Sequence, residues 1–189
     1  MPSTNNNNAA NVTAGKPKVT GAIYVAPIGS TAPTDATTDL AAAFKCLGYI
    51  SEDGLTHAVS RESEEIKEWG GKTIMTSQTE YAEKFTFTTI EMLNADVLKA
   101  IFGASNVSET TGLRTTATDG SELPASMWVF DMMMSNNKAR RIFVPNGRVS
   151  SVGEIGYKNN EPVGAEVEVT AFPDGSAKFS YTFDELPTT

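Results

Sequence analysis

One histidine and one cysteine limit the chemistry available to this chain of 189 residues. A zinc site made of histidine and cysteine ligands needs four of them, and one residue of each type cannot supply the set. A Ser-His-Asp triad would have to use His57, and the chain contains no Gly-x-Ser-x-Gly nucleophile elbow. We therefore expect no metal site, His57 as an exposed loop residue, and Cys46 as a small buried hydrophobic residue.

Two further patterns are similar to parts of functional sites, but each lacks something essential. Gly71-Lys72-Thr73 looks like the end of a phosphate-binding loop, yet Ile66 occupies the position of the required first glycine. The carboxylate pairs Glu64-Glu65 and Glu166 with Glu168 could serve a glycosidase only in a cleft that separates their pKa values. The sequence indicates no such cleft. It predicts a protein that is not an enzyme and uses no cofactor.

The composition favours a folded, acidic protein. Hydrophobic residues make up 40% and charged residues 20%, which is sufficient for a packed core. The net charge of -8 disfavours non-specific binding of DNA, but it is compatible with a channel through which DNA slides. Residues 1–16 contain no apolar signal region, and no apolar run is long enough to cross a bilayer. We expect a soluble protein that is made in a cytoplasm and uses no membrane.

Charged residues cluster in two places along the chain. Segment 52–69 is mainly acidic and ends in Trp69, whereas segment 138–148 is basic and contains no acid. Solvated hairpin ends are the usual explanation for such runs. The alternative is that the two patches meet between copies, because a head-to-tail contact needs two complementary surfaces. The candidate inter-subunit residues are Glu62, Glu64, Glu65, Glu68, Trp69, Lys138, Arg140, Arg141 and Arg148.

The C-terminal third alternates apolar and polar residues, as half-buried strands do. Segments 163–171 and 177–184 each place apolar residues at every second position, and a turn sequence at 173–176 separates them. This pattern predicts a hairpin with one apolar face. Glu166 and Glu168 would lie on its polar face.

The preceding segments predict three more antiparallel strands, at 127–134, 139–144 and 148–157. Asn146-Gly147 is typical of a tight turn between the last two. A two-residue turn at Asn136-Asn137 would set Met133 opposite Arg140 and Asp131 diagonally beside that arginine. Together with the hairpin, these strands would form a five-strand meander.

Segment 127–134 differs from the other strands because both of its faces are apolar. Trp128 and Phe130 would lie on one face, and Met127 and Val129 on the other, where only Asp131 is charged. Such a strand is covered on both sides. A sandwich within the chain or a neighbouring subunit could supply the cover.

The N-terminal half predicts further strands and one helix. The strands are expected at 19–27, 44–50, 72–77 and 81–89. Asn94 and Gly103 would cap a helix that packs one face on the sheet. The sequence therefore predicts a mainly β protein, with a flexible arm at 1–16 and one β domain at 17–186.

Several segments resemble the major tail proteins of siphophages, which form the tail tube. The resemblance rests on 48–55, 61–71, 86–103, 145–149 and 153–155, in the same order as in that family. It implies an antiparallel β-sandwich or barrel with one flanking helix, and a long hairpin or loop at about 55–80. It also implies six-membered rings stacked into a tube.

Further expectations follow from this resemblance. DNA would pass through the lumen during ejection, and Glu166 and Glu168 are candidates for facing it. The partners would be other copies of the chain and the tape-measure, tail-terminator and distal tail proteins. The protein would be made in the bacterial cytoplasm and would reside in the virion tail. The tube of a contractile secretion system and a monomeric decoration or adhesin module remain alternatives.

Overall fold

The computed structural model describes residues 7, 12–18, 21–135 and 137–186. The protein is mainly β, with antiparallel strands and one short α-helix, which confirms the predicted fold class. The elements are β1 (Gly15–Pro17), β2 (Ile23–Pro27), β3 (Lys45–Cys46), β4 (Ile50–Lys67), β5 (Thr73–Thr89), α1 (Ala95–Phe102), the 3-10 turn η2 (Ala104–Asn106), β6 (Val107–Thr110), β7 (Leu113–Thr116), β8 (Ser126–Met134), β9 (Ala139–Val152), β10 (Ala165–Ala171) and β11 (Tyr181–Asp184).

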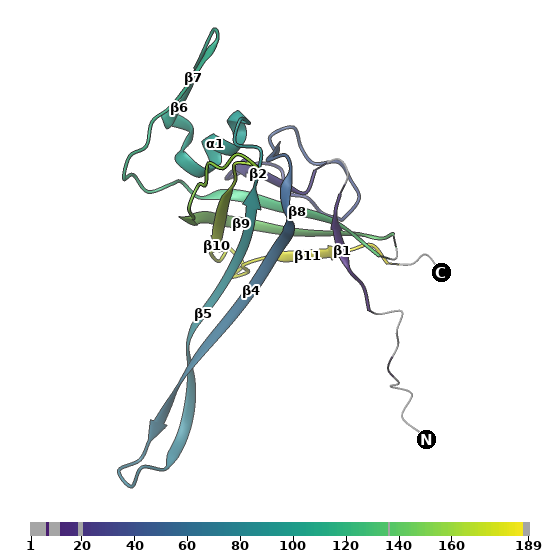
Figure 1. The fold of residues 1–189 in the computed structure, drawn as a ribbon. Coiled ribbons are helices and arrows are strands. Elements are labelled where there is room, and N and C mark those ends of the chain that lie inside the picture. Colours follow the sequence, from purple (N-terminus) through teal and green to yellow (C-terminus); the bar gives the residue numbers. More distant parts are fainter. Residues whose placement is uncertain (1–6, 8–11, 19–20, 136, 187–189) are drawn as a thin grey trace.

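One large sheet contains most of these strands, in the order β3-β2-β8-β9-β10-β5-β4 (Figure 1). Strand β9 connects its two parts. The first half of β9 pairs with β8 and β11, and the second half pairs with β10. The sheet folds over between these parts, because Phe85 of β5 stacks on Phe130 of β8 with ring centroids 4.8 Å apart. Strands β6 and β7 form a separate small hairpin.

Strand β8 is buried on both faces, as its sequence predicts. Trp128 and Phe130 belong to the main core, together with β5 and β10. Met127 and Val129 pack into a second core on the opposite face. The chain itself covers both faces of this strand, so no neighbouring subunit is needed to bury it.

The predicted C-terminal hairpin is wrong. β10 lies between β9 and β5, while β11 pairs with the beginning of β9. The turn itself forms, because the Asp174 carboxylate accepts hydrogen bonds from the amides of Ser176 and Lys178. Alternation reveals which face of a strand is buried but not which strand lies beside it. The five-strand meander is wrong for the same reason.

The predicted turn at Asn146-Gly147 is also wrong, because β9 continues through both residues and ends at Val152. The glycine serves close packing. A Cβ atom on Gly147 would lie 2.8 Å from Cδ1 of Trp128 and 3.1 Å from Cγ1 of Val169. The indole N–H of Trp128 also donates to the Gly147 carbonyl at 3.3 Å.

The register of β8 and β9 is one residue away from the prediction. Met133 lies opposite Ala139 rather than Arg140, and Asp131 lies opposite Arg141. The connection is longer than two residues, because the amide of Met134 donates to the carbonyl of Lys138. This shift turns Arg141 toward Asp131.

The N-terminal strands are partly as expected. β2 lies inside the predicted 19–27, but only Lys45–Cys46 of the predicted 44–50 forms β3, and Cys46 is only half-buried. The strands predicted at 72–77 and 81–89 are one continuous strand, β5. Gly15–Pro17 pairs with β8, and most of the arm predicted at 1–16 lies outside the described residues.

The predicted helix is confirmed as α1. The side chain of Asn94 accepts a hydrogen bond from the amide of Asp96, which satisfies one free donor of the first turn. Val97, Leu98 and Ile101 are buried on the face that packs against the rest of the protein.

Candidate assembly surfaces

A long hairpin formed by β4 and β5 projects from the body of the protein (Figure 1). Near its base, Phe85 and Phe87 are part of the main core. From about residue 61 to residue 80 the side chains are mostly exposed. At the tip, the amide of Gly71 donates to the Glu68 carbonyl at 2.8 Å, and Gly71 has a positive φ of 87°. Glycine adopts this backbone conformation without steric cost.

Large apolar side chains gather at the end of this hairpin. Trp69 in the turn is fully exposed, at 104%, and Ile74 and Met75 beside it are 65% and 54% exposed. An isolated two-stranded ribbon is only marginally stable in water, and an exposed tryptophan is typical of a binding hot spot. The end of the hairpin is therefore a candidate contact surface for another protein chain.

The acidic candidates lie on the same hairpin. Glu62, Glu64 and Glu65 are exposed on β4, and Glu68 begins the turn. Local contacts neutralise part of this charge, because Lys67 lies 3.5 Å from the Glu65 carboxylate. The structure thus brings these acids together with Trp69, and their role between subunits stays a prediction.

A buried carboxylate anchors the base of the hairpin. Glu83 is 3% exposed and accepts hydrogen bonds from the hydroxyls of Tyr81, at 3.1 Å, and Ser180, at 2.5 Å. His57 Nε2 lies 2.7 Å from the same carboxylate, and its ring stacks on Phe85. Burial and the charge of Glu83 raise the pKa of Tyr81. The expectation that His57 is a loop residue is wrong: it lies in β4 and helps to join the hairpin to the body.

Two of the basic candidates are paired with acids from β11 or its end. Lys138 donates to Glu185 at 2.9 Å, and Arg140 donates to Asp184 at 2.9 Å. The amide of Ala139, together with Lys138, lowers the pKa of Glu185. Segment 138–148 contains no acid, so the sequence alone did not reveal these partners. The tertiary fold places 184–185 beside it.

Arg141 is a buried structural residue. Its side chain is 1% exposed and forms two hydrogen bonds to Asp131, at 2.7 and 2.8 Å. It also donates to the carbonyls of Asp35 and Thr38, at 3.0 and 2.8 Å. Burial opposes its charge, but these bonds to Asp131 leave the pKa of Arg141 raised. Its contacts lie inside this chain rather than at an exposed patch.

Arg148, the last basic candidate, lies at the other half of β9. It forms an ion pair with Glu122, and its guanidinium lies 5.7 Å from the centroid of the Phe172 ring. All four basic candidates thus have acidic partners within the chain. A contact with another subunit would have to share or replace these pairs.

The second half of β9, with β10, β5 and β4, presents a polar face away from the core. Glu168 on this face accepts hydrogen bonds from Lys84, at 3.0 Å, and from the hydroxyl of Ser150, at 2.9 Å. The Lys84 bond, followed by that of Ser150, lowers the pKa of Glu168. Because paired residues share a face, the registers place these mostly small or polar residues here, together with two cations: Thr56, Ala58, Lys84, Thr86, Thr88, Arg148, Ser150, Ser151, Glu166, Glu168 and Thr170.

This part of the sheet has two open edges. In the described residues, β4 pairs only with β5, and 148–152 of β9 pair only with β10. Unpaired edge strands expose backbone N–H and C=O groups that can extend a sheet into another chain. The polar face is therefore bounded on both sides by backbone that is free to pair.

The described residues contain no group of three or more His, Cys, Asp or Glu side chains placed to hold a metal ion. Within the same residues, no helix combines the length and apolar character needed to cross a membrane.

Comparison with known proteins identifies the family. The model of the family described as "Phage tail tube protein" matches residues 3–185. The chain belongs to this family. A phage tail tube protein is a structural, non-enzymatic component of the virion tail, and membership implies self-assembly and partners in the tail. The family match does not distinguish siphophages from other tailed phages.

Among the solved structures with a similar chain is the one titled "Cryo-EM structure of the anti-feeding prophage cap (AFP tube terminating cap)". It is 11% identical to this tail tube protein, the alignment covers 96% of this chain and 98% of that one, and the TM-score is 0.46. A search of the curated proteins returned no match.

Proposed function

We propose that this tail tube protein is the repeating subunit of a siphophage tail, where six copies form a ring and stacked rings form a hollow tube. The observation that carries this proposal is the polar face of β9, β10, β5 and β4 with an open edge on each side. In a ring, β4 of one copy would pair with the second half of β9 in the next. Closing the ring in this way removes both open edges of this part of the sheet.

The chemistry of the polar face suits a channel for DNA. Two cations lie among the residues named above, and both are paired within the chain, Lys84 with Glu168 and Arg148 with Glu122, so neither is offered as a free cation to phosphates. Glu166 on the same face is exposed and repels phosphate groups. Affinity for DNA depends mainly on the lysine and arginine side chains that neutralise phosphates. A lumen lined by this face would let DNA slide during ejection, with Glu166 and Glu168 facing it.

The hairpin would connect successive rings. Residues 61–67 of β4 extend by about 3.3 Å each, so the exposed strand reaches about 20 Å beyond the body, and the turn at 68–72 adds to this reach. This length is sufficient for contact with a neighbouring ring. Glu62, Glu64, Glu65, Glu68 and Trp69 would lie in that contact. Of the basic candidates, Arg141 is buried against Asp131 and would not take part. Tape-measure, tail-terminator and distal tail proteins would bind the lumen and the tube ends.

Electron microscopy of the purified full-length protein tests this function. We expect hollow rings or tubes after incubation with the distal tail and tape-measure proteins of the same phage, at low and moderate salt. Six-fold symmetry in top views would support the ring, and protein that stays monomeric with these partners would overturn it. A monomer would favour the decoration or adhesin alternative.

Charge reversal on the hairpin tests the contact between copies. The double variant Glu64→Lys with Glu65→Lys should block growth of the tube, while its circular dichroism spectrum and unfolding midpoint stay unchanged because both side chains are exposed. Tubes of normal length from this variant would exclude a role for these two acids.

A further inference from the structure

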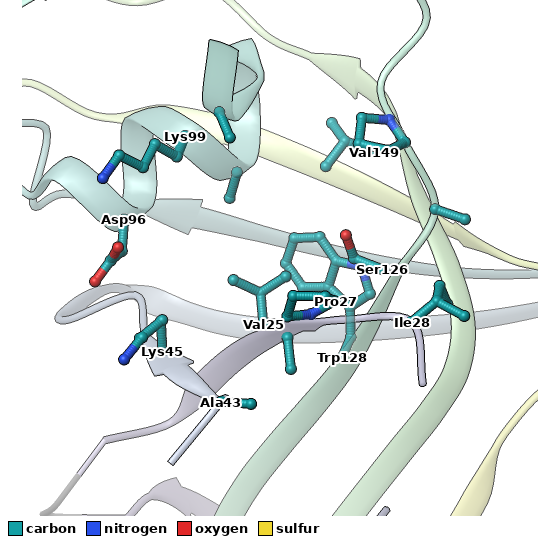
Figure 2. A pocket seen from close by; sticks show the side chains of 15 residues that line it. Val25, Pro27, Ile28, Ala43, Lys45, Asp96, Lys99, Ser126, Trp128 and Val149 are labelled. Carbon is teal, nitrogen blue, oxygen red and sulfur yellow. The ribbon is translucent and has the colours of Figure 1, made fainter. Parts of the chain in front are cut away.

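An apolar cleft lies between helix α1 and strand β2. It has a volume of about 520 Å³, within the range of clefts that bury most of a small ligand. Figure 2 shows Val25, Pro27, Trp128 and Val149 among its lining residues. The indole of Trp128 is 1% exposed and forms a rigid part of the wall. The cleft is therefore a preformed apolar site.

The rim of the cleft is charged at one end. Lys45, Lys99 and Asp96 lie there, on the same side in Figure 2. The Lys45 ammonium donates to the carbonyl of Ala42 at 3.2 Å and remains near the surface. Two lysines and one aspartate give this rim a net positive charge, which favours an acidic occupant with an apolar anchor.

The end of the β4–β5 hairpin has these complementary properties. Trp69 is fully exposed and Ile74 is 65% exposed. The sequence beside them carries the acids Glu64, Glu65 and Glu68 against the bases Lys67 and Lys72. A tip with an unburied indole and a net negative charge matches an apolar cleft with a positive rim.

The two surfaces lie at opposite ends of the molecule. In Figure 1, α1 and β2 lie in the upper part of the body, below the β6–β7 hairpin, whereas the tip of β4 and β5 is at the bottom. A contact between different surfaces on opposite sides of the molecule is heterologous, and it repeats from copy to copy as an open filament when the rotation between copies does not close a ring. This geometry supports growth along one axis.

We propose that the cleft beside α1 is the receptor for the hairpin tip of another copy of this chain, with the Trp69 indole as the anchor. This inference rests on the proposed function, because it identifies the surface that joins one ring to the next. Glu65 and Glu68 pair with Lys45 and Lys99 at the rim, on the side where Asp96 also lies. Burying the indole in the cleft supplies most of the affinity.

Cysteine crosslinking tests this contact in assembled protein. In a Cys46→Ser background, Lys72→Cys labels the tip and Ala43→Cys labels the lining of the cleft. Mild oxidation should produce a ladder of covalent multimers on a non-reducing gel, because each chain carries both halves of a heterologous contact. The control pair joins Lys72→Cys to Tyr157→Cys, an exposed position that does not line the cleft. It should give no ladder.

The anchor is tested by substitution. Trp69→Ala should raise the critical concentration for tube growth about 10-fold or more, whereas the matched variant Tyr157→Ala should not change it. Both residues are exposed, so the unfolding midpoint should stay the same in each variant. The Trp69 fluorescence of the original protein should shift to shorter wavelength as tubes grow. If the crosslinked ladder forms but Trp69→Ala leaves the critical concentration for tube growth unchanged, Trp69 is not the anchor of this contact.

The outcomes separate the contact from the function. Tubes that form without the Lys72–Ala43 ladder would overturn the cleft as the receptor and leave the tube function intact. Protein that forms neither tubes nor a ladder in the presence of its tail partners would overturn both. Charge reversal of Lys45 and Lys99 should impair growth, and reversal of Glu65 and Glu68 in the same chain should restore it. Failure of this rescue would contradict the pairing at the rim.

Discussion

Replacing Arg141 by methionine should destabilise the monomer strongly. The substitution leaves the buried carboxylate of Asp131 with Lys18, whose ammonium lies 3.7 Å away and is partly exposed. It also removes the donor for the carbonyls of Asp35 and Thr38. Breaking a buried ion pair on one side costs about 3–5 kcal/mol. That loss is a large part of the 5–15 kcal/mol of stability typical of a domain.

Urea unfolding of the monomeric protein at neutral pH, followed by tryptophan fluorescence, measures this loss. The neighbouring variant Arg140→Met is the matched control, because its ion pair with Asp184 is partly exposed and should contribute less than about 1 kcal/mol. The double variant Asp131→Leu with Arg141→Met should be more stable than Arg141→Met alone, because no isolated charge remains buried.

Two results would refute this reasoning. If Arg141→Met lowers the free energy of unfolding no more than Arg140→Met does, the buried pair does not hold β8 to β9. If the double variant is no more stable than the single one, the cost does not come from an unpaired carboxylate. A fully stable Arg141→Met monomer that fails to assemble would instead support the role between subunits predicted from the sequence.

Three further predictions concern packing, charge and capping. Gly147→Ala should lower the free energy of unfolding by about 1–3 kcal/mol, because the added methyl group collides with Trp128; an unchanged urea midpoint would contradict this packing. Glu168→Gln should cost up to about 1 kcal/mol at pH 7. The hydrogen bond from Lys84 holds the pKa of Glu168 in the folded protein below 4.5. The stability lost in the variant should therefore disappear as the pH falls from about 4.5 through that pKa. A loss that stays the same at every pH in urea titrations would show that the Lys84–Glu168 pair is not its cause. Asn94→Ala should destabilise the protein by about 1 kcal/mol in the same assay, whereas Asn94→Ser, which keeps an oxygen acceptor for the amide of Asp96 and adds no charge beside Glu91, should cost less.

The sequence predicted those features that depend on neighbours along the chain. Alternation correctly placed β10, the apolar run at 127–134 correctly placed β8, and the cap residue Asn94 correctly marked the beginning of α1. The two apolar faces of β8 correctly predicted two buried sides. Each of these signals reflects a backbone period or a local hydrogen bond, so a short window of residues is sufficient.

Partners that are distant in the chain were not predictable in the same way. Asn146-Gly147 has the composition of a turn, and only the position of Trp128 shows why a glycine stands inside β9. His57 has no distinctive neighbours in sequence, and its contact with Glu83 arises because β4 and β5 pair in a particular register. Local composition describes what a residue can do, but not what lies beside it.

The sequence by itself determined the class of the fold, the acidic character of the segment 52–69 that ends in Trp69, and the absence of histidine and cysteine sets for metal or triad chemistry. The tertiary structure alone decided that Arg141 is buried against Asp131, that Lys138 and Arg140 have the acidic partners Glu185 and Asp184, and that an apolar cleft forms beside α1. Periodicity and composition act over a few residues. Ion pairs, strand neighbours and clefts depend on how strands far apart in the chain align, and a shift of one residue changes every such contact.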